Sequence, residues 1–383
     1  MIVPEDLAKR MLKGYGLSVP NGRIAHTPDE AVKIANELGG SGVVKAIIPS
    51  GGRGKAGGVR VCRSKAQVRS AAAALLNKEL LGHVVNSVLV EELVPVYREI
   101  YASVVANTSS DRIDLMISLA GGIEIEKTAH ADQKSLVQLS LQPGELLPVH
   151  RLLLWLRNNG IVLNELPELA VTLVKLHRAA ADFDATLLEV NPLAVTDDGR
   201  LVLLDCKLEV DDNGLSRQPA LNEVYLASLS QRELRARQLG VSYVPLDGNI
   251  GVITSGAGLG MATMDLLQQR DLAPANFLDT GGAISEELVK GALELVMEPP
   301  QVKGAIINLY GGINRMLEAA RGILAALKTI PGDRPVVVKI LGNQQEEAWA
   351  LLEGQPNVHV IRVVQTEAAV DRLVKLLSEC SAG

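Results

Sequence analysis

Aromatic residues are scarce in this chain of 383 residues, which has two Phe, two Trp and six Tyr beside 35 Gly. Proteins that bind single-stranded nucleic acid stack bases on aromatic side chains, so this composition argues against that class. Excess positive charge is also lacking, because 44 Asp and Glu outnumber 38 Lys and Arg and leave a net charge of −6. We therefore expect neither nucleic acid nor a membrane surface as a partner.

Cysteines and long apolar runs are rare as well. Cys62, Cys206 and Cys380 are far apart and form no CxxC pair, so they support neither a disulfide framework nor a cysteine zinc site. The N-terminal segment is charged from Glu5 onward, and no run approaches about 18 apolar residues. We expect no secretory signal and no membrane span, and therefore a soluble protein of a reducing compartment, the cytoplasm.

Apolar residues make up 47% of the chain, enough for a sizeable core, and its length favours two or three domains. In the first part, several predicted strands follow one another without room for a helix between them, which is typical of an α+β fold with antiparallel pairs. These strands are Val43–Ile48, Val88–Leu93, Glu99–Val105, Ile113–Leu119, Leu187–Val190 and Leu201–Leu204.

After about residue 235 the pattern changes, because each predicted strand is followed by a helical stretch. This alternation predicts a doubly wound parallel sheet, hence an α/β fold. Its strands are Ile250–Thr254, Ala305–Leu309, Val336–Leu341 and Val358–Val363. The segment Gln231–Val241 is rich in charge and has no strong core pattern, so we interpret it as the connection between domains 1–235 and 236–383.

The glycine-rich segment Gly51–Gly58 follows the predicted strand Val43–Ile48 and carries two cations. Such a loop can present backbone N–H groups and positive charge to phosphates. It is not a Walker A loop, because Lys55 is followed by Ala56 and not by Ser or Thr. The remaining interpretation is a glycine loop that folds over a nucleotide, with Lys45 as a second phosphate ligand; the alternative is an exposed basic surface loop.

A hairpin further along the chain carries oxygen ligands. Strand alternation places Glu189 and Asn191 on one face, and the turn signal Asp197–Arg200 brings Asp205 to within about one residue of the position opposite Asn191. Mg²⁺ takes one or two oxygen ligands from protein and the rest from phosphates and water. Asn191 and Asp205 meet that need, and the alternative is polar capping of two strand ends.

Three predicted strand ends in the second domain are rich in glycine: Ser255–Gly258, Tyr310–Asn314 and Gly342–Asn343. Ligands of parallel sheets bind beyond the carboxyl ends of the strands. A helix that begins near Asn314 would point free N–H groups and its positive dipole end at an anion. A dinucleotide site at Ser255–Gly260 is the alternative, but its third glycine is misplaced.

Nine sequence blocks, in order across nearly the whole chain, resemble the β subunits of the succinate–CoA ligase family. The blocks are GGRGKAGG, GGIEIEK, LLEVNPL, LLDCKLEVDDN, SRQP, LDGNIG, GAGLGMATMD, PANFLD and NLYGGINR. The resemblance implies an N-terminal ATP-grasp domain followed by a flavodoxin-like CoA-ligase domain. It also implies a heterotetrameric ligase of the tricarboxylic acid cycle.

The implied reaction uses ATP, Mg²⁺, coenzyme A and a small dicarboxylate. A phosphohistidine, succinyl phosphate and the succinyl thioester interconvert, and ADP is made at the ATP-grasp site. In this family the phosphorylated histidine belongs to the α subunit, which also binds most of coenzyme A. This sequence agrees, because none of its six His lies in a Gly-His-Ala-Gly-type loop. The nearest candidate, His83 in Leu81-Gly82-His83-Val84, lacks the set of flanking glycines of such a loop.

The resemblance also assigns roles to individual residues. Glu189 would face the partner's histidine and orient its imidazole, and Asn191 and Asp205 would bind Mg²⁺. Pro20 matches the residue of ATP-using members and favours ATP over GTP. Phosphates and adenosine would contact Lys45, Gly52, Arg53, Gly54, Glu91 and Glu99, and the acid substrate would contact Ser255, Gly312, Ile313 and Asn314.

The sequence departs from the family pattern at three places. Ser255 replaces the usual Asn, Leu317 an acidic residue, and the segment Ile47–Ser50 lacks a His found nearby in the family. The shorter Ser255 could admit a bulkier or hydroxylated acid, so malate or another dicarboxylate is an alternative to succinate. Two further alternatives are a stand-alone ATP-grasp carboxylate–amine ligase and a non-catalytic nucleotide-binding subunit.

Overall fold

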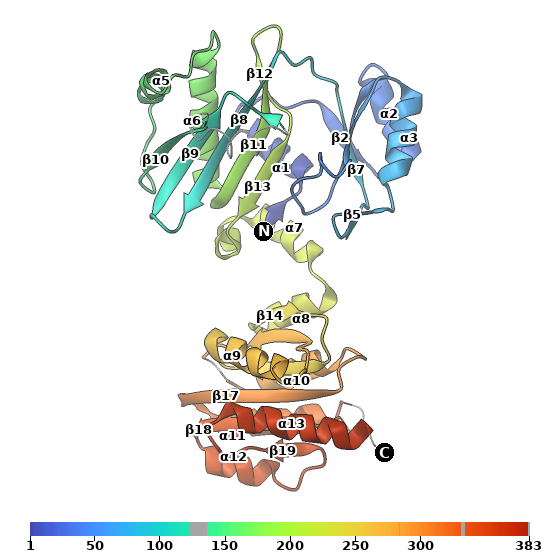
Figure 1. Cartoon of the computed structure of the whole chain (residues 1–383), viewed down its shortest axis with the longest axis vertical. Coiled ribbons are helices and arrows are strands. Elements are labelled where there is room, and N and C mark those ends of the chain that lie inside the picture. Colours follow the sequence, from blue (N-terminus) through green and yellow to red (C-terminus); the bar gives the residue numbers. More distant parts are fainter. Residues whose placement is uncertain (123–135, 283, 331–333, 382–383) are drawn as a thin grey trace. The chain divides into compact units, whose positions relative to one another are not determined.

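The computed structural model describes residues 1–122, 136–282, 284–330 and 334–381 (Figure 1). The chain divides into two compact units, Met1–Tyr225 (the N-terminal unit) and Leu226–Gly383 (the C-terminal unit). The division falls within helix α7 (Pro219–Ser228) and not after residue 235. The segment expected to connect the domains contains helix α8 (Gln231–Leu239), which packs against α10 (Glu286–Met297) of the C-terminal unit.

The N-terminal unit is built on a seven-stranded sheet in the order β1-β13-β11-β8-β9-β10, with β12 beside β11. All its strand pairs are antiparallel, which confirms the prediction for this part of the chain. Helix α6 (Leu166–Asp182) packs on β8 and β11 and α5 (Val149–Asn158) packs on α6, around an aliphatic core. The strands are β1 (Ile2–Val3), β8 (Arg98–Asn107), β9 (Arg112–Ser118), β10 (Leu136–Leu141), β11 (Ala185–Val195), β12 (Leu201–Leu203) and β13 (Cys206–Val210).

A second, four-stranded antiparallel sheet in the same unit has the order β2-β7-β3-β4. Its strands are β2 (Gly22–Ala25), β3 (Gly42–Ala46), β4 (Val59–Cys62) and β7 (Val88–Glu91), and β5 (Glu79–Leu80) and β6 (His83–Val84) form a separate hairpin. Helices α2 (Pro28–Glu37) and α3 (Lys65–Leu75) pack on this sheet. Thr27 Oγ1 accepts a hydrogen bond of 3.2 Å from the Glu30 N–H, so α2 begins where its capping pattern predicts.

Two short elements complete the N-terminal unit. Helix α1 (Glu5–Lys13) follows Pro4 and packs against β13. The 3-10 helix η3 (Asp212–Arg217) lies between β13 and α7. Figure 1 shows α1 in blue between the two sheets, so its side chains can reach residues of both.

The C-terminal unit holds a six-stranded sheet in the order β14-β16-β15-β17-β18-β19. Strands β15 to β19 run parallel, as predicted, and β14 adds an antiparallel edge to β16; neither β14 nor β16 is predicted from the sequence. The strands are β14 (Ser242–Pro245), β15 (Ile250–Thr254), β16 (Asn276–Asp279), β17 (Gly304–Arg315), β18 (Val336–Asn343) and β19 (Val358–Val360).

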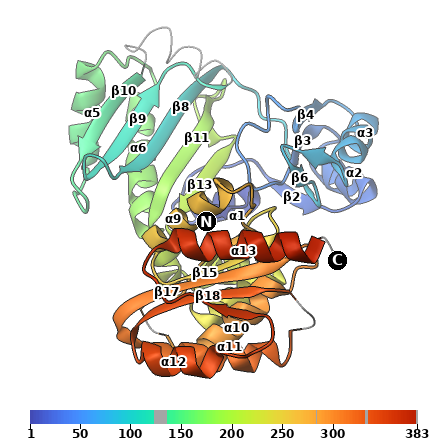
Figure 2. The same ribbon diagram turned by 60° about the horizontal axis from the view of Figure 1, so that its bottom comes forward.

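Helices cover both faces of this sheet, which is the doubly wound arrangement. Helices α9 (Ala257–Gln268) and α13 (Thr366–Ser381) pack on one face. The opposite face carries α10, α11 (Met316–Leu327) and α12 (Gln345–Leu352), and Figure 2 shows α13 and these three helices on opposite sides. No helix in the described part of the chain has both the length and the apolar character that a bilayer span requires.

Candidate active site

A cavity of about 950 Å³ lies in the N-terminal unit and is lined by residues of both sheets. It gathers every residue of this unit to which the sequence assigns a role. The ten residues are Pro20, Lys45, Gly52, Arg53, Gly54, Glu91, Glu99, Glu189, Asn191 and Asp205. They come from seven separate segments of the chain, and the fold therefore brings the predicted site residues of this unit into one place.

The glycine segment Gly51–Gly58 connects β3 to β4 and borders this cavity. Gly52 has φ +75°, a conformation that favours glycine because it has no Cβ. Arg53 turns inward and is only 8% exposed. Its guanidinium donates to the Ala46 carbonyl at 3.1 Å and pairs with Asp205 Oδ1 at 2.9 Å, so this side chain holds the loop against the strands beneath it.

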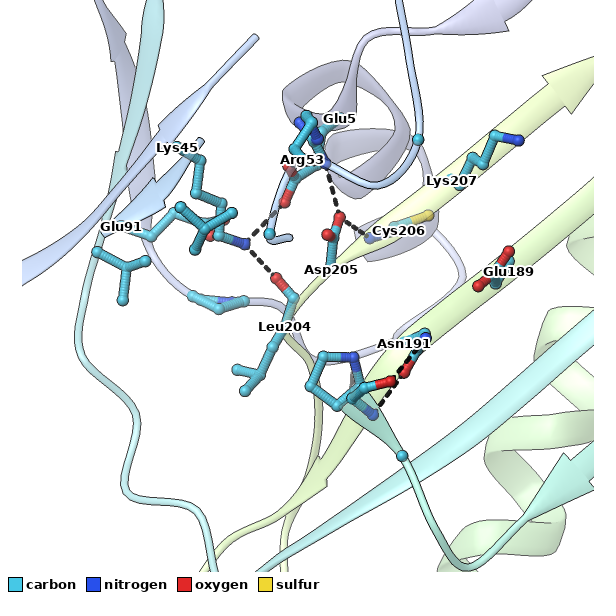
Figure 3. A pocket seen from close by; sticks show the side chains of 18 of the residues that line it. Glu5, Lys45, Arg53, Glu91, Glu189, Asn191, Leu204, Asp205, Cys206 and Lys207 are labelled. Atoms are coloured by element: carbon cyan, nitrogen blue, oxygen red, sulfur yellow. Dashed lines mark hydrogen bonds and ion pairs between the residues drawn. The ribbon is translucent and has the colours of Figure 1, made fainter. Parts of the chain in front are cut away.

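Arg53 belongs to a group of six buried or mostly buried charged side chains, Glu5, Lys9, Lys45, Arg53, Glu91 and Asp205, which we call the charge cluster. Figure 3 labels all of them except Lys9. Lys45 Nζ lies 2.8 Å from Glu5 Oε1 and 2.8 Å from Glu91 Oε2. Lys9 Nζ lies 2.8 Å from Glu5 Oε1 and 2.6 Å from Glu91 Oε1. Three cations and three carboxylates are formally balanced, which is the condition for placing so many charges in a low-dielectric interior.

Glu5 is the centre of the charge cluster. Besides both lysines it contacts Arg53, whose terminal nitrogen lies 2.7 Å from Glu5 Oε2 without the alignment of a hydrogen bond. Burial alone would raise the pKa of Glu5, but Lys45, Lys9 and Arg53 outweigh it and hold this pKa well below the usual range. Burial would likewise lower the pKa of Lys45, and Glu5, Glu91 and Asp205 raise it instead.

Glu5 and Lys9 are functional candidates that the sequence reading misses. Both lie on the buried face of α1 with Ala8 and Leu12. Because they are charged, a search for apolar residues at helical spacing does not select them. A signal was present: an acid and a base four residues apart, in register with the apolar stripe of a short helix, form an ion pair on the face that is buried. Their partners, Lys45 and Glu91, lie far away in the sequence and could not be deduced from it.

Asn191 and Asp205 lie next to each other, as the hairpin predicts. The Asn191 N–H donates to the Asp205 carbonyl at 3.3 Å, and β12 pairs with β11 through Leu193 and Leu203. The Asn191 side-chain oxygen accepts from the Gly122 N–H at 2.7 Å, while Asp205 Oδ1 accepts from the Cys206 N–H at 2.8 Å. Burial raises the pKa of Asp205, and Glu5 raises it further, against the lowering effect of Lys45 and Arg53.

This donor set suits Mg²⁺ better than a transition metal. One carboxylate and one amide supply only oxygen atoms, and no group of three or more His, Cys, Asp or Glu side chains forms a metal cage in the described residues. Mg²⁺ commonly binds through one or two protein oxygens and completes its shell with phosphates and water. Asn191 and Asp205 therefore fit a magnesium site that forms with a bound nucleotide.

Glu189 and Lys207 stand opposite each other on the neighbouring strands β11 and β13, and both line the cavity. Figure 3 shows them near Asn191, which is also on β11, and Asp205, which directly precedes β13. Glu99 borders the cavity from β8, next to the Gly122 backbone. Of the GGIEIEK block, only Gly121 and Gly122 lie in the described residues; the rest falls outside them.

The four remaining predicted site residues lie in the C-terminal unit. Gly312, Ile313 and Asn314 form an irregularity of β17 between Gly311, which pairs with Gly342, and Arg315, which pairs with Asn343. Ile313 is 93% exposed. This irregular segment is at the carboxyl edge of the parallel sheet and directly precedes α11, so the place at which ligands of such sheets bind coincides with a helix N-terminus.

Ser255 is tied to the same segment. Its hydroxyl accepts from the Tyr310 N–H at 2.9 Å and donates to the Tyr310 carbonyl at 3.1 Å. One side chain thus links the residue that follows β15 to the middle of β17. Nearby, Asp279 Oδ1 accepts from the N–H groups of Gly256, at 2.6 Å, and Gly281, at 2.8 Å, and so fixes the turn that leads into α9.

Comparison with known proteins extends these observations. A model described as an ATP-grasp domain matches residues 3–195, and one described as a CoA-ligase matches residues 253–371. The chain is 40% identical over 357 residues to the GDP-forming succinate–CoA ligase β subunit of Thermus thermophilus, covering 93% of this chain and 94% of that protein. The chain belongs to the succinate–CoA ligase β-subunit family.

Other relatives agree with this membership. The ADP-forming succinate–CoA ligase β subunit of Chloroflexus aggregans is 40% identical over 359 residues, which cover 92% of this chain and 93% of that one. ATP citrate lyase from Methanothrix soehngenii shares the fold with a TM-score of 0.77 at 18% identity, over 99% of both chains. The chain therefore has the ATP-grasp domain and the CoA-ligase domain of its family, in the predicted order.

Proposed function

We propose that this chain is the nucleotide-binding β subunit of an ADP-forming acid–CoA ligase that phosphorylates a histidine of a partner α subunit. The observation that carries the proposal is the single cavity in which glycine loop, charge cluster, Asn191, Asp205 and Glu189 meet. Membership of a family whose members are named succinate–CoA ligase β subunits supports it. None of the described residues that line the cavity is a histidine, which supports an acceptor from another chain.

The first step is transfer of the γ-phosphoryl group of ATP to a nitrogen of that histidine. The nitrogen lone pair attacks phosphorus as the bond to the β-phosphate oxygen breaks, and ADP leaves with that electron pair. Mg²⁺, held by Asn191 and Asp205, would neutralise phosphate charge when it is bound. Glu189 accepts a hydrogen bond from the second ring nitrogen and stabilises the imidazolium that forms, because its carboxylate is negative.

The later steps consume the phosphohistidine. The acid takes the phosphoryl group to form an acyl phosphate, and the thiol of coenzyme A displaces phosphate to form the thioester. The C-terminal unit contributes the segment Gly312–Asn314 and the N-terminus of α11, which would hold the acid and the phosphohistidine through backbone N–H groups. Coenzyme A is bound largely by the α subunit in this proposal.

ATP is the proposed nucleotide, on the basis of Pro20, which lines the cavity. Relatives named for ADP formation and for GDP formation are equally similar to this chain, at 40% identity. The initial rates with ATP and GTP at equal concentration decide the point. A higher kcat/KM with ATP is expected, and a preference for GTP would reject the Pro20 argument.

Succinate is the proposed acid, and malate is a second candidate that Ser255 favours. The Ser255 side chain is short and both of its hydrogen bonds go to the Tyr310 backbone, which leaves more room at the strand end than an asparagine would. A Ser255→Asn variant is expected to change the ratio of kcat/KM between succinate and malate. An unchanged ratio would show that Ser255 does not select the acid.

The function is tested with the chain co-expressed with an α-type partner. ADP release and CoA-thioester formation are followed with succinate, malate, citrate and itaconate. Thioester formation that needs both chains, ATP and one of these acids is the expected result. ATP turnover by this chain alone with an amine acceptor would favour a stand-alone ATP-grasp ligase, and absence of turnover with every acid would favour a non-catalytic subunit.

A further inference from the structure

Among the described residues, four cationic side chains line the cavity, and two of them belong to the charge cluster. Lys45, Arg53, Lys55 and Lys207 supply these charges. Lys45 and Arg53 are already neutralised by Glu5, Glu91 and Asp205 at distances of 2.7 to 2.9 Å. Because the cluster has no net formal charge, it offers little surplus positive charge to the triphosphate of a nucleotide. Besides Mg²⁺, a cationic side chain outside the cluster would therefore be needed to stabilise the phosphoryl group as it moves.

Lys207 is in the right place to supply it. It lies on β13 directly opposite Glu189 of β11, in the antiparallel register that puts both side chains on the same face of the sheet. A Cβ on Gly51 would lie 3.8 Å from Lys207 Cε and 4.0 Å from its Nζ, so the ammonium lies near the start of the glycine segment. Lys207 thus stands between the loop proposed to hold phosphates and the carboxylate proposed to meet the acceptor (Figure 3).

The ion pair of Lys207 differs from those of the charge cluster. Its ammonium lies 2.5 Å from Glu209 Oε1, two residues along the same strand, and the two side chains are 35% and 31% exposed. The cluster's lysines and their glutamate partners are at most 6% exposed. A partly exposed pair contributes little to stability, so Lys207 can exchange Glu209 for a phosphate at little cost. Lys45 cannot leave its buried carboxylates so easily.

We propose that Lys207 is a catalytic residue whose ammonium binds the γ-phosphoryl oxygens while the group passes from ATP to the partner's histidine. This inference rests on the function proposed above. In the transition state the phosphoryl group carries its charge on three oxygens, and Glu189 beside it would repel them. The Lys207 ammonium offsets that repulsion. Its attraction to the phosphate oxygens becomes stronger as negative charge develops on the leaving β-phosphate oxygen, and the lysine neither gains nor loses a proton.

The test measures two quantities for each variant in the complex with the α-type partner. One is the single-turnover rate of label transfer from ATP labelled on its γ-phosphate to the partner at saturating ATP, and the other is the dissociation constant of Mg·ATP. Lys207→Met is expected to lower the rate by about 10² to 10³-fold. The dissociation constant should change by much less, because Lys207 acts in the transition state more than in the ground state.

Two matched variants accompany it. Lys207→Arg keeps the positive charge and is expected to recover most of the lost rate. Glu209→Gln removes the partner of Lys207 but no proposed ligand, and its rate should stay within about threefold of wild type because a partly exposed pair contributes little. Thermal unfolding midpoints of all variants show whether each chain is folded.

The outcomes are distinct. A folded Lys207→Met variant that transfers label at the wild-type rate, or that loses ATP affinity as much as rate, overturns the role of Lys207 and leaves the proposed function standing. If Lys207→Met does not fold, a folded Lys207→Arg variant that transfers label about 10²-fold more slowly than wild type overturns the role of Lys207 as well, because the positive charge is kept in that variant. No label on the partner with the wild-type pair overturns the proposed function itself and Lys207 with it.

Discussion

Each unit buries a lysine in the middle of a sheet, and the two lysines have opposite surroundings. Lys45 of β3, 5% exposed, lies among carboxylates, and its pKa is raised by Glu5, Glu91 and Asp205 against the lowering effect of burial. Lys339 of β18, 2% exposed, donates to the neutral Asn308 side chain at 3.0 Å, and burial lowers its pKa. Burial alone therefore does not decide the state of a buried lysine; its partners do.

The difference follows the layout of the two units. The charge cluster borders the cavity of the N-terminal unit. The Asn308 side-chain nitrogen in turn donates to the hydroxyl of Thr263 of α9, at 2.9 Å, and to the hydroxyl of Thr366 at the start of α13, at 3.2 Å. The neutral network joins strands to the helices that cover them, and we interpret it as structural, while the charge cluster prepares a binding site.

The two tryptophans allow each unit to be followed separately. Trp155 lies in the N-terminal unit and Trp349, whose indole N–H donates to the Ile340 carbonyl at 3.0 Å, in the C-terminal unit. A chain with Trp349→Phe reports unfolding of the N-terminal unit by fluorescence, and one with Trp155→Phe reports the other. The following predictions use these two backgrounds.

The largest effect is expected from Glu5→Gln. It leaves Lys9, Lys45 and Arg53 with one carboxylate fewer. Removing one partner of a buried ion pair lowers the free energy of unfolding by about 3–5 kcal/mol. Denaturant unfolding should show this loss in the Trp349→Phe background, which reports the N-terminal unit, and not in the Trp155→Phe background. Because the pKa of Glu5 is lowered by folding, the loss is fully present above the ordinary pKa of glutamate and disappears as the pH falls through the lowered value.

The matched control is Glu37→Gln, which breaks the pair of Glu37 with Arg23, whose side chains are 62% and 58% exposed. It should cost about 1 kcal/mol or less, since solvent screens the pair. Equal losses for Glu5→Gln and Glu37→Gln would remove the distinction between the charge cluster and an ordinary surface pair.

A smaller effect, with a characteristic pH dependence, is expected at Lys339. Because folding lowers its pKa, the folded chain binds fewer protons than the unfolded chain between that lowered pKa and about 10.4, the value of an unfolded lysine. The free energy of unfolding of the C-terminal unit should therefore rise with pH in this window, by less than about 1.4 kcal/mol per pH unit. Urea unfolding in the Trp155→Phe background measures it.

Lys339→Met should remove this rise, whereas Lys328→Met, a change of an exposed lysine in the same unit, should leave it in place. A rise of the same slope in Lys339→Met would assign it to other groups. A fall of stability with pH in the wild type would contradict the assignment of a lowered pKa.

The smallest losses of stability are expected at helix N-caps, and they should be nearly equal in the two units. Ser64 Oγ accepts from the Gln67 N–H at 3.3 Å in the N-terminal unit, and Ser285 Oγ accepts from the Leu288 N–H at 3.2 Å in the C-terminal unit. Ser64→Ala and Ser285→Ala should each cost about 1 kcal/mol, because the lost hydrogen bond is local. Clearly unequal losses, measured by the same denaturant unfolding, would show that the units differ in more than their buried charges.

Local patterns in the sequence predict much of the fold. The capping residue Thr27, the turn at Asp197–Arg200 and the alternation after residue 235 lead to α2, to the β11–β12 hairpin and to the parallel sheet, because each depends on neighbours along the chain. Strand β16 escapes prediction because it has four residues and two of them are polar, and its place is set by pairing with β15 and β14.

The sequence predicts which residues belong to the candidate site, but not which of their side chains form ion pairs with one another. The sequence places Asp205 within about one residue of the position opposite Asn191, because a hairpin brings its two strands side by side, and the two residues share a backbone hydrogen bond. It assigns Lys45 and Glu91 to phosphates and adenosine, and the structure pairs them with each other and with Glu5 and Lys9 of α1. Contacts between side chains 40 to 82 residues apart depend on how two sheets and a helix pack, which local patterns do not specify.

The most direct test of the account is label transfer from ATP labelled on its γ-phosphate to the α-type partner, in the presence of Mg²⁺. The wild-type pair should place acid-labile, base-stable label on the partner chain, as expected of a phosphohistidine. A folded Asp205→Asn variant should place none there, because it removes the only carboxylate of the proposed magnesium pair. Label that stays on this chain, or label on the partner at the wild-type rate with Asp205→Asn, would contradict the account.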